Sequence, residues 1–235
     1  MPKTRNDLTI YDKEAAGWWD SDTRWVRTLH NMVPGRLKWF DNHVDWAGKD
    51  VLDLGCAGGF MAEAIDARGA HLTGIDPAAE AIAAARRHAN ETGRDIRYDV
   101  GVGEELPYPD QSFDIVVSVD VLEHVSDLEQ VVGEVRRVLR PGGWFLFDTI
   151  NRNPIARLAT ITIAEDVLGL LPKGTHDPDM FIKPQELRSV LRDQGFDVGP
   201  FVGLGPRGLD RKLDPVFGRV PGTLIIYMGT ARAAA

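Results

Sequence analysis

Acidic residues and glycines follow one another in an order that suits the binding of a nucleoside. The stretch from Asp50 to Phe60 reads Asp-Val-Leu-Asp-Leu-Gly-Cys-Ala-Gly-Gly-Phe, so an apolar run leads directly into Gly55 and Gly58. Glycines at a turn from a strand into a helix permit positive φ and let a ligand approach the bare backbone. A second apolar run ends in Asp76, about 20 residues further on, where a carboxylate can bind both hydroxyls of a ribose.

The type of nucleoside is indicated by Asp53, which stands two residues before Gly55. The chain has no Gly-Lys-Ser/Thr, which excludes a P-loop, and its glycines do not follow the G-x-G-x-x-G pattern. A carboxylate at position 53 would repel a pyrophosphate but would suit a cation. The D-x-G-x-x-G pattern with Asp76 downstream resembles motif I of class I S-adenosylmethionine (SAM) methyltransferases, in which the turn faces an amino-acid moiety and a sulfonium.

A second group of chemically capable side chains is Asp120, Glu123 and His124. If 120–124 forms one helical turn, the spacing places both carboxylates and the imidazole on one face. Three such ligands could hold a hard divalent ion, or His124 could act as a general base for a hydroxyl proton. The simpler alternative is a solvated loop whose histidine pairs with an acid. His176, in a polar turn, is a weaker candidate for the same chemistry.

Composition limits the classes of function. Hydrophobic residues make up 43% of the 235 residues and charged residues 26%, which is typical of a globular protein. The net charge of −8 argues against binding nucleic acid by phosphate neutralisation. The single cysteine, Cys56, excludes an internal disulfide and fits a reducing compartment. No 18-residue apolar run or signal-peptide pattern occurs, so we expect a cytoplasmic protein.

The elements that position these residues alternate between strand and helix. Strands are predicted at 51–54, 71–75, 96–100, 113–119, 144–150, 196–202 and 223–230. This order predicts an α/β fold: a doubly wound, mostly parallel, seven-stranded sheet with an antiparallel C-terminal hairpin, N-terminal helices and a helical cap. Gly55, Asp76, Glu104 and Asp120 then fall at the carboxyl ends of the strands, where ligands bind in such sheets.

The whole chain is interpreted as one methyltransferase domain with four parts. They are an N-terminal helical extension (1–48), a SAM-binding core (49–150), a substrate cap (151–183) and a C-terminal helix with strands (184–235). Within these parts, Pro34 is expected to interrupt a helix over 25–44. Ser126 with Glu129 predicts a capping box, and 206–221 is expected to be a loop.

Several longer motifs carry a family resemblance. They are Trp18-Trp19-Asp20, Leu29-His30 through Pro34 and Arg36, Leu122-Glu-His-Val, Asn151-Arg-Asn153, Pro172-Lys-Gly-Thr-His-Asp177 and Phe181-Ile-Lys-Pro184. Together with the glycine motif they resemble the O-methyltransferases of ubiquinone biosynthesis over nearly the whole chain. That family methylates polyprenylated catechols. The sequence departs from the family at position 57, which is Ala rather than Gly, and at position 120, which is Asp rather than Glu.

The resemblance implies roles for individual residues. Arg36, Gly55, Asp76 and Val119 would contact SAM, and Asp120, Glu123 and His124 would match the family's magnesium ligands. Many SAM enzymes carry an aspartate for the adenine amine where this chain has Val102, so a main-chain group or Glu104 must make that contact. The apolar segment 155–171 would touch membrane lipid, against the alternative of a helix that packs on its own domain.

The leading hypothesis is a SAM-dependent O-methyltransferase that acts on a phenol or catechol, with a polyprenylated quinone precursor as one acceptor. A phenol has a pKa near 10, so a cation or a histidine beside it would favour the phenolate. One alternative keeps SAM and takes a specialised-metabolite phenol, amine or carboxylate as acceptor. Another is a SAM-binding or NAD-binding module without chemistry. The oligomeric state and the need for a metal are left open.

Overall fold

The computed structural model describes residues 6–19 and 23–234, so Asp20 of the tryptophan motif lies outside the described residues. Helices and strands follow one another in the order α1 (Thr9–Lys13), η1 (Ala15–Gly17), α2 (Arg24–Phe40), β1 (Asp50–Leu54), α3 (Phe60–Asp66), β2 (His71–Asp76), α4 (Ala79–Glu91), β3 (Arg97–Val100), β4 (Phe113–Ser118), α5 (Leu128–Val138), β5 (Leu139–Ile150), α6 (Pro154–Arg157), η2 (Leu158–Val167), α7 (Pro184–Asp193), β6 (Phe196–Val198), β7 (Val202–Leu209), β8 (Pro215–Val220) and β9 (Ile226–Ala233). The predicted early alternation of strand and helix is therefore confirmed as far as β3, whereas β4 follows β3 without a helix between them.

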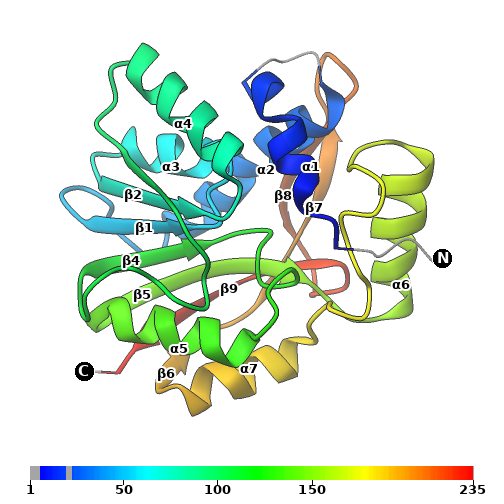
Figure 1. Cartoon of the computed structure of the whole chain (residues 1–235). Helices are drawn as coiled ribbons and strands as arrows, with labels where there is room; N and C mark the ends of the chain where they lie inside the picture. The colour runs from blue at the N-terminus through cyan, green and yellow to red at the C-terminus, as the bar shows by residue number, and fades with distance from the viewer. Residues whose placement is uncertain (1–5, 20–22, 235) are drawn as a thin grey trace.

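One mixed sheet forms the centre of the molecule (Figure 1). Its strand order is β3-β2-β1-β4-β5-β9-β7-β8, and β6 pairs with β9. The first five strands of this order are parallel, and β9 pairs antiparallel with β5, β6 and β7. The order reverses direction at β1, so the carboxyl ends of β1 and β4 flank the switch point at which open α/β sheets bind ligands.

The sheet has helices on both faces: α3 and α4 lie on one side, and α5 and α7 on the other (Figure 1). Neighbouring residues of β1 point to opposite faces, as the pleat requires. Val51 packs in the hydrophobic cluster of α2, α3 and α4, whereas Leu52 packs in the cluster of α5 and α7. Because both faces of the parallel strands are buried, β1 and β4 read as nearly continuous apolar runs.

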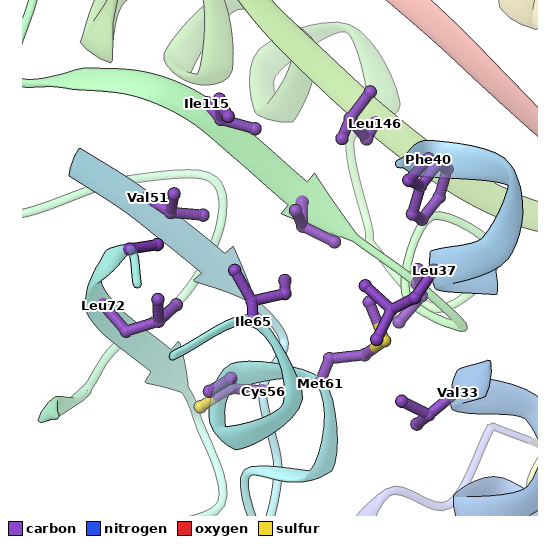
Figure 2. Packing of buried hydrophobic residues seen from close by; sticks show 14 of the residues in the cluster. Val33, Leu37, Phe40, Val51, Cys56, Met61, Ile65, Leu72, Ile115 and Leu146 are labelled. Atoms are coloured by element: carbon purple, nitrogen blue, oxygen red, sulfur yellow. The ribbon is translucent and has the colours of Figure 1, made fainter. Parts of the chain in front are cut away.

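Helix α2 packs closely against the sheet through apolar side chains. Figure 2 shows Val33, Leu37 and Phe40 of this helix turned toward side chains of the sheet and of α3. Pro34 lies inside the continuous helix Arg24–Phe40, so the expected interruption is wrong. A proline inside a helix costs about 3 kcal/mol, and the buried face of α2 offsets that cost.

The C-terminal region differs most from the prediction. The segment expected as a loop forms most of the β7–β8 hairpin, so the sheet of the described residues has nine strands rather than the predicted seven. Glycines interrupt the apolar pattern by which these strands could be predicted from the sequence, but they permit close backbone contacts. A Cβ on Gly203 would lie 2.4 Å from the carbonyl oxygen of Gly222, and one on Gly35 in α2 would lie 2.6 Å from that of Phe217. The hairpin is thus held by contacts that no local pattern reveals.

Helix α5 also begins differently from the expected capping box. Its N-cap is Asp127, whose carboxylate accepts a hydrogen bond from the backbone N–H of Gln130. Ser126 instead donates from both its backbone and its hydroxyl to Glu104.

Within residues 6–19 and 23–234, no helix combines the length and the apolar character needed to cross a bilayer.

Candidate active site

A cavity of about 720 Å³ opens at the carboxyl ends of β1, β2 and β4. It is bordered by the glycine turn after β1, by the tip of β2, by the loop after β3 and by the segment after β4. Eight of the ten predicted site residues line it: Arg36, Asp53, Gly55, Asp76, Glu104, Val119, Asp120 and His124. Gly58 and Glu123 are not part of its wall.

The glycine turn gives the cavity a bare backbone floor. Gly55 has φ of 76°, and a Cβ at this position would lie 2.2 Å from Cγ2 of Val121. Gly58 faces Trp18 instead, because a Cβ there would lie 1.8 Å from Cδ1 of the indole. Ala57 also has positive φ, 42°, although it carries a side chain. The turn therefore needs glycine at Gly55 because of its positive φ and its contact with Val121, and at Gly58 because Trp18 packs against it.

Asp53 carries an unsatisfied carboxylate oxygen in this cavity. Its side chain is buried, and Oδ2 has no hydrogen-bond partner among the residues that the structure describes. Burial raises the pKa of the Asp53 carboxyl to about 7. A backbone hydrogen bond from Ala62 acts in the opposite direction but does not cancel this effect. A buried oxygen without a partner is costly, so a cationic ligand that supplied a donor there would be bound favourably.

Asp76 lies at the tip of β2 and is held in place by the backbone. Its Oδ1 accepts from the N–H of Ala78 at 2.8 Å, and its Oδ2 accepts from the N–H of Ala57 at 2.9 Å. Burial raises the pKa of this carboxyl to about 6, and these two hydrogen bonds oppose that shift. Each oxygen retains a further acceptor position, so the oriented carboxylate can still receive two hydroxyl donors.

The loop after β3 supplies Glu104 to the opposite part of the wall. Burial alone would raise its pKa, but hydrogen bonds from the hydroxyl and backbone of Ser126 hold the pKa of the Glu104 carboxyl below its usual value. Val102 of the same loop is 44% exposed. Both Val102 and Gly103 line the cavity. Val119, which is buried, follows β4 on the adjoining wall.

Arg36 reaches the cavity from α2, and two carboxylates hold it. Its Nε donates to Oδ2 of Asp148 at 2.6 Å, and its Nη2 lies 2.5 Å from Oδ2 of Asp120. Asp148 also accepts the backbone N–H of Asp120 at 2.8 Å. The arginine is not a solvated surface residue, since its side chain is 2% exposed. These contacts leave Nη1 for the carboxylate of a ligand.

The helical turn on which the grouping of Asp120, Glu123 and His124 depended does not form. Asp120 has φ of 55°, in the left-handed region, and the segment forms an irregular turn rather than a helix. The Asp120 carboxylate consequently pairs with Arg36 and is separated from the cluster that Glu123 and His124 form. The third member of that cluster is His176, from the segment between η2 and α7, and one ligand atom from each of the three lies within 4.8 Å of the others.

Glu123 and His124 each keep one buried polar atom without a hydrogen bond from the described residues, Oε1 and Nε2 respectively. Their other polar atoms are engaged: Oε2 of Glu123 accepts from Thr149, and Nδ1 of His124 contacts Oδ1 of Asn6 at 2.6 Å. Burial raises the pKa of Glu123 to about 8, and it lowers the pKa of His124 to about 3 with a contribution from His176.

Sequence reasoning missed two contributions to the site. The first is the N-terminal segment, which lines the cavity with Leu8, Thr9, Tyr11, Asp12 and Trp18; of these only Trp18 belongs to a motif named from the sequence. The second is Asp148, which anchors both Arg36 and Asp120. Its place near the end of the fifth strand candidate, among apolar residues, was a usable signal, because an acid buried in a strand needs a cationic partner.

Comparison with known proteins supports the same chemistry. Residues 52–147 match the model of a methyltransferase domain family. A ubiquinone biosynthesis O-methyltransferase of Pseudomonas syringae pv. tomato is 41% identical over 202 residues, which cover 85% of this chain and 86% of that protein. The ubiquinone biosynthesis O-methyltransferase of Thiobacillus denitrificans is 39% identical over 200 residues, which cover 84% of this chain and 85% of that protein.

The chain belongs to the ubiquinone biosynthesis O-methyltransferase family. Its fold is shared with more distant solved methyltransferases. A SAM-dependent methyltransferase of Thermotoga maritima, described as a possible histamine N-methyltransferase, superposes with a TM-score of 0.67 at 18% identity, covering 95% of this chain and 97% of that one. A SAM-dependent methyltransferase of Aquifex aeolicus superposes with a TM-score of 0.65 at 16% identity. The superposition covers 95% of this chain and 98% of that one. The predicted Rossmann-like methyltransferase fold of this O-methyltransferase family member is thereby confirmed.

Proposed function

We propose that this chain transfers the methyl group of SAM to a phenol or catechol hydroxyl of a quinone precursor. The observation that carries the proposal is that one cavity contains both the acids that suit a charged nucleoside and the imidazole of His124. Family membership supports the reaction type, because the relatives are ubiquinone biosynthesis O-methyltransferases. When bound, SAM supplies a methyl group that its sulfonium already activates.

The residues of the cavity fit this cofactor. The partnerless Oδ2 of Asp53 suits the ammonium group, and Nη1 of Arg36 suits the carboxylate of the same amino-acid moiety. Asp76 is oriented for the two ribose hydroxyls. Glu104 or the main chain near Val102 would receive the adenine amine, and Gly55 borders the cavity without a side chain. Gly58 supports that site indirectly through Trp18.

At the other end of the cavity, the chain must orient the acceptor oxygen and lower its affinity for its proton. His124 lies at the wall with its Nε2 unengaged by the described residues, and Glu123 is its neighbour. These groups can favour the phenolate directly as proton acceptors, or indirectly through a cation that they hold. Alignment of the oxygen with the methyl group supplies the remaining rate enhancement.

The magnesium set implied by the family resemblance does not fit the arrangement of the side chains. Asp120 pairs with Arg36 and is not among the side chains that gather with Glu123 and His124. The group that does assemble contains two imidazoles, whereas magnesium prefers oxygen ligands in an octahedral arrangement. We therefore assign no step of the reaction to magnesium.

We also propose a peripheral contact with a lipid surface through 155–171. Five large apolar side chains of this segment are exposed: Ile155, Leu158, Ile163, Val167 and Leu168. A lipophilic quinone precursor would enter the cavity from such a surface. Co-sedimentation with lipid vesicles should fall several-fold for Val167→Ser with Leu168→Ser. The matched control is Leu209→Ser with Leu213→Ser, which removes two exposed apolar side chains at the β7–β8 hairpin. Equal losses in both variants would contradict the proposal.

A methyl-transfer assay tests the function. Radiolabelled SAM is incubated with the full chain and a panel of acceptors: prenylated catechols, unprenylated catechols, and amines or carboxylates. The proposal predicts transfer to catechol oxygen, with the prenylated acceptors preferred. Preference for an unprenylated metabolite would favour the specialised-metabolite alternative. Tight binding of NAD by calorimetry, with no transfer to any acceptor, would favour the non-catalytic module.

The cofactor assignments are tested separately by calorimetry with SAM. Asp76→Ala removes acceptors for two hydroxyls and should weaken binding by roughly 10–100-fold, since hydrogen bonds to charged groups contribute about 1.5–3 kcal/mol. Glu80→Ala, which removes an exposed acid near the start of α4, is the matched control and should leave the affinity unchanged. An Asp76→Ala variant that binds SAM as tightly as the control would contradict the assignment.

A further inference from the structure

Tyr11 stands at the wall of the cavity, opposite the glycine turn and the strand tips that the sequence predicts as the site. It belongs to the short helix α1 and lines the cavity. The ring centroids of Tyr11 and Trp18 lie 5.9 Å apart at an interplanar angle of 54°, and those of Tyr11 and Trp25 lie 6.2 Å apart at 74°. Tilted and edge contacts stabilise aromatic pairs, so the two indoles hold the ring of Tyr11 at the wall.

The backbone around Tyr11 is fixed from two sides. Oδ1 of Asp12 accepts a hydrogen bond from the backbone N–H of Glu80 at 3.0 Å. The backbone N–H of Asp7 donates to the carbonyl oxygen of Gly174 at 3.2 Å. Helix α1 therefore lies between α4 and the segment that follows η2 (Figure 1). Because a helix of five residues has little stability of its own, these contacts are what position Tyr11 at the cavity.

The Tyr11 hydroxyl is surrounded by carboxylates and keeps its proton. Burial raises the pKa of Tyr11 well above its usual value, and the charges of nearby acids raise it further. In order of their effect, these acids are Asp120, Asp76, Glu123 and Glu165. The hydroxyl makes no hydrogen bond within the part of the chain that the structure describes. It therefore offers one donor and two lone pairs to a ligand in the cavity.

The same acids show that Tyr11 lies between the two ends of the cavity. Asp76 belongs to the end that suits the ribose of the cofactor. Glu123 belongs to the acceptor end, and Glu165 contacts the His176 ring of the same cluster at 2.8 Å. In the proposed function, the ammonium, carboxylate and ribose groups of the cofactor have other partners. The Tyr11 hydroxyl consequently remains for an oxygen of the acceptor.

We propose that the hydroxyl of Tyr11 binds the oxygen next to the one that is methylated, so that the acceptor is a catechol rather than a monophenol. This inference rests on the proposed function and adds the substrate class to it. A hydrogen bond to one oxygen of the ring fixes the direction of its neighbour, and correct alignment with the methyl group is a large part of the rate enhancement. Tyr11 is thus a specificity-determining residue, which selects the oxygen that reacts.

The hydroxyl of Tyr11 takes no part in bond making or breaking. The reacting oxygen forms its bond to the methyl carbon as the sulfur–methyl bond breaks, and its proton leaves to solvent. The neighbouring oxygen keeps its hydrogen bond to Tyr11 throughout. Because that hydrogen bond is the same before and during the transfer, its loss should raise KM and change kcat little.

Tyr11→Phe tests the inference, because it removes the hydroxyl and retains the ring. The full chain is assayed with 4-prenylcatechol, whose two hydroxyls are inequivalent, and with 4-prenylphenol, which has one. The wild type should prefer the catechol and form one monomethyl isomer in excess. Tyr11→Phe should raise KM for the catechol roughly 3–10-fold, the factor that one neutral hydrogen bond supplies. It should lower the isomer ratio by a similar factor and leave the values for the phenol within twofold.

The matched control is Tyr108→Phe. It removes a hydroxyl that donates to Asp99 and does not line the cavity, so the isomer ratio should stay at the wild-type value. Calorimetric titration of 4-prenylcatechol into the chain loaded with S-adenosylhomocysteine gives a readout without turnover. Tyr11→Phe should weaken this binding roughly 3–10-fold, while its affinity for SAM and its thermal unfolding stay close to those of the wild type.

Three outcomes would overturn the inference. They are an unchanged isomer ratio and catechol affinity in Tyr11→Phe, equal losses with the catechol and the phenol, and a large loss of SAM affinity, which would assign the hydroxyl to the cofactor. Each of them leaves the proposed function standing if the wild type methylates the catechol. A wild type that methylates neither acceptor would contradict the proposed function, and the inference with it.

Discussion

The guanidinium of Arg36 contacts the carboxylate of Asp120, with 2.5 Å between Nη2 and Oδ2. Asp148 completes the network by accepting from Nε of Arg36 and from the backbone N–H of Asp120. The network joins α2 to the segment after β4, where Asp120 has φ of 55°. It holds the Asp120 carboxylate at Arg36, whereas Glu123 and His124 lie together with His176.

Loss of the arginine should destabilise the fold strongly. Asp148 is fully buried, and removal of one partner of a buried ion pair costs about 3–5 kcal/mol because a charge is left uncompensated. Arg36→Met should lower the free energy of unfolding by that amount in urea denaturation. The control is Arg68→Met, which breaks a partly exposed pair with Asp41 and should cost about 1 kcal/mol or less. Equal losses in both variants would contradict this account of the network.

Ionisation of Asp53 should lower the free energy of unfolding of the cofactor-free protein as the pH rises. Its pKa is about 7 in the folded protein and about 3.9 in an unfolded chain. Because its pKa is higher in the folded protein, the contribution of Asp53 to folding stability is fully present below about pH 4. That contribution is lost as the pH rises toward 7. Asp53→Asn should therefore stabilise the protein without SAM by about 1–3 kcal/mol at pH 8 and by less at pH 5.

The same Asp53→Asn variant should bind SAM more weakly, because the charge that suits the ammonium group is absent. Thermal unfolding at the two pH values, with and without SAM, measures both effects. A variant that is destabilised at pH 8 without SAM would show that Asp53 is satisfied in the free protein.

Ala57 should be a point of stored backbone strain. A residue with a side chain in the left-handed region costs about 1–3 kcal/mol, and Ala57 has φ of 42°. Ala57→Gly should raise the free energy of unfolding by about 1 kcal/mol, after the greater flexibility of glycine in the unfolded chain is subtracted. Ala83→Gly, inside α4, should change it by about 1 kcal/mol in the opposite direction. Chemical denaturation of both variants decides the matter; destabilisation by both would rule out the strain.

Gly58 should control the cavity through Trp18. A Cβ at Gly58 would lie 1.8 Å from the indole, so Gly58→Ala must displace the ring from the cavity wall. We expect a change in tryptophan fluorescence and roughly tenfold weaker SAM binding, which corresponds to about 1.4 kcal/mol. Gly208→Ala is the control, since a Cβ there meets nothing within 4 Å. Unchanged SAM affinity in Gly58→Ala would separate Trp18 from the cofactor site.

The parts of the site that could be predicted from the sequence depend on local rules. Gly55 and Asp76 follow apolar runs, and residues at the carboxyl ends of parallel strands share one edge of the sheet. Asp120 could not be placed in this way, because its carboxylate pairs with Arg36, a partner far away in the sequence. His176 was expected as a minor candidate, and only the folded cap shows that it lies with Glu123 and His124.

The most direct test of the central claim is a crystal structure of the full chain with S-adenosylhomocysteine and a catechol. The account predicts that the ribose hydroxyls lie within hydrogen-bond distance of Asp76, the ammonium group beside Asp53, and a catechol oxygen at the wall formed by His124. Nucleoside density anywhere other than the cavity at the carboxyl ends of β1, β2 and β4 would contradict it.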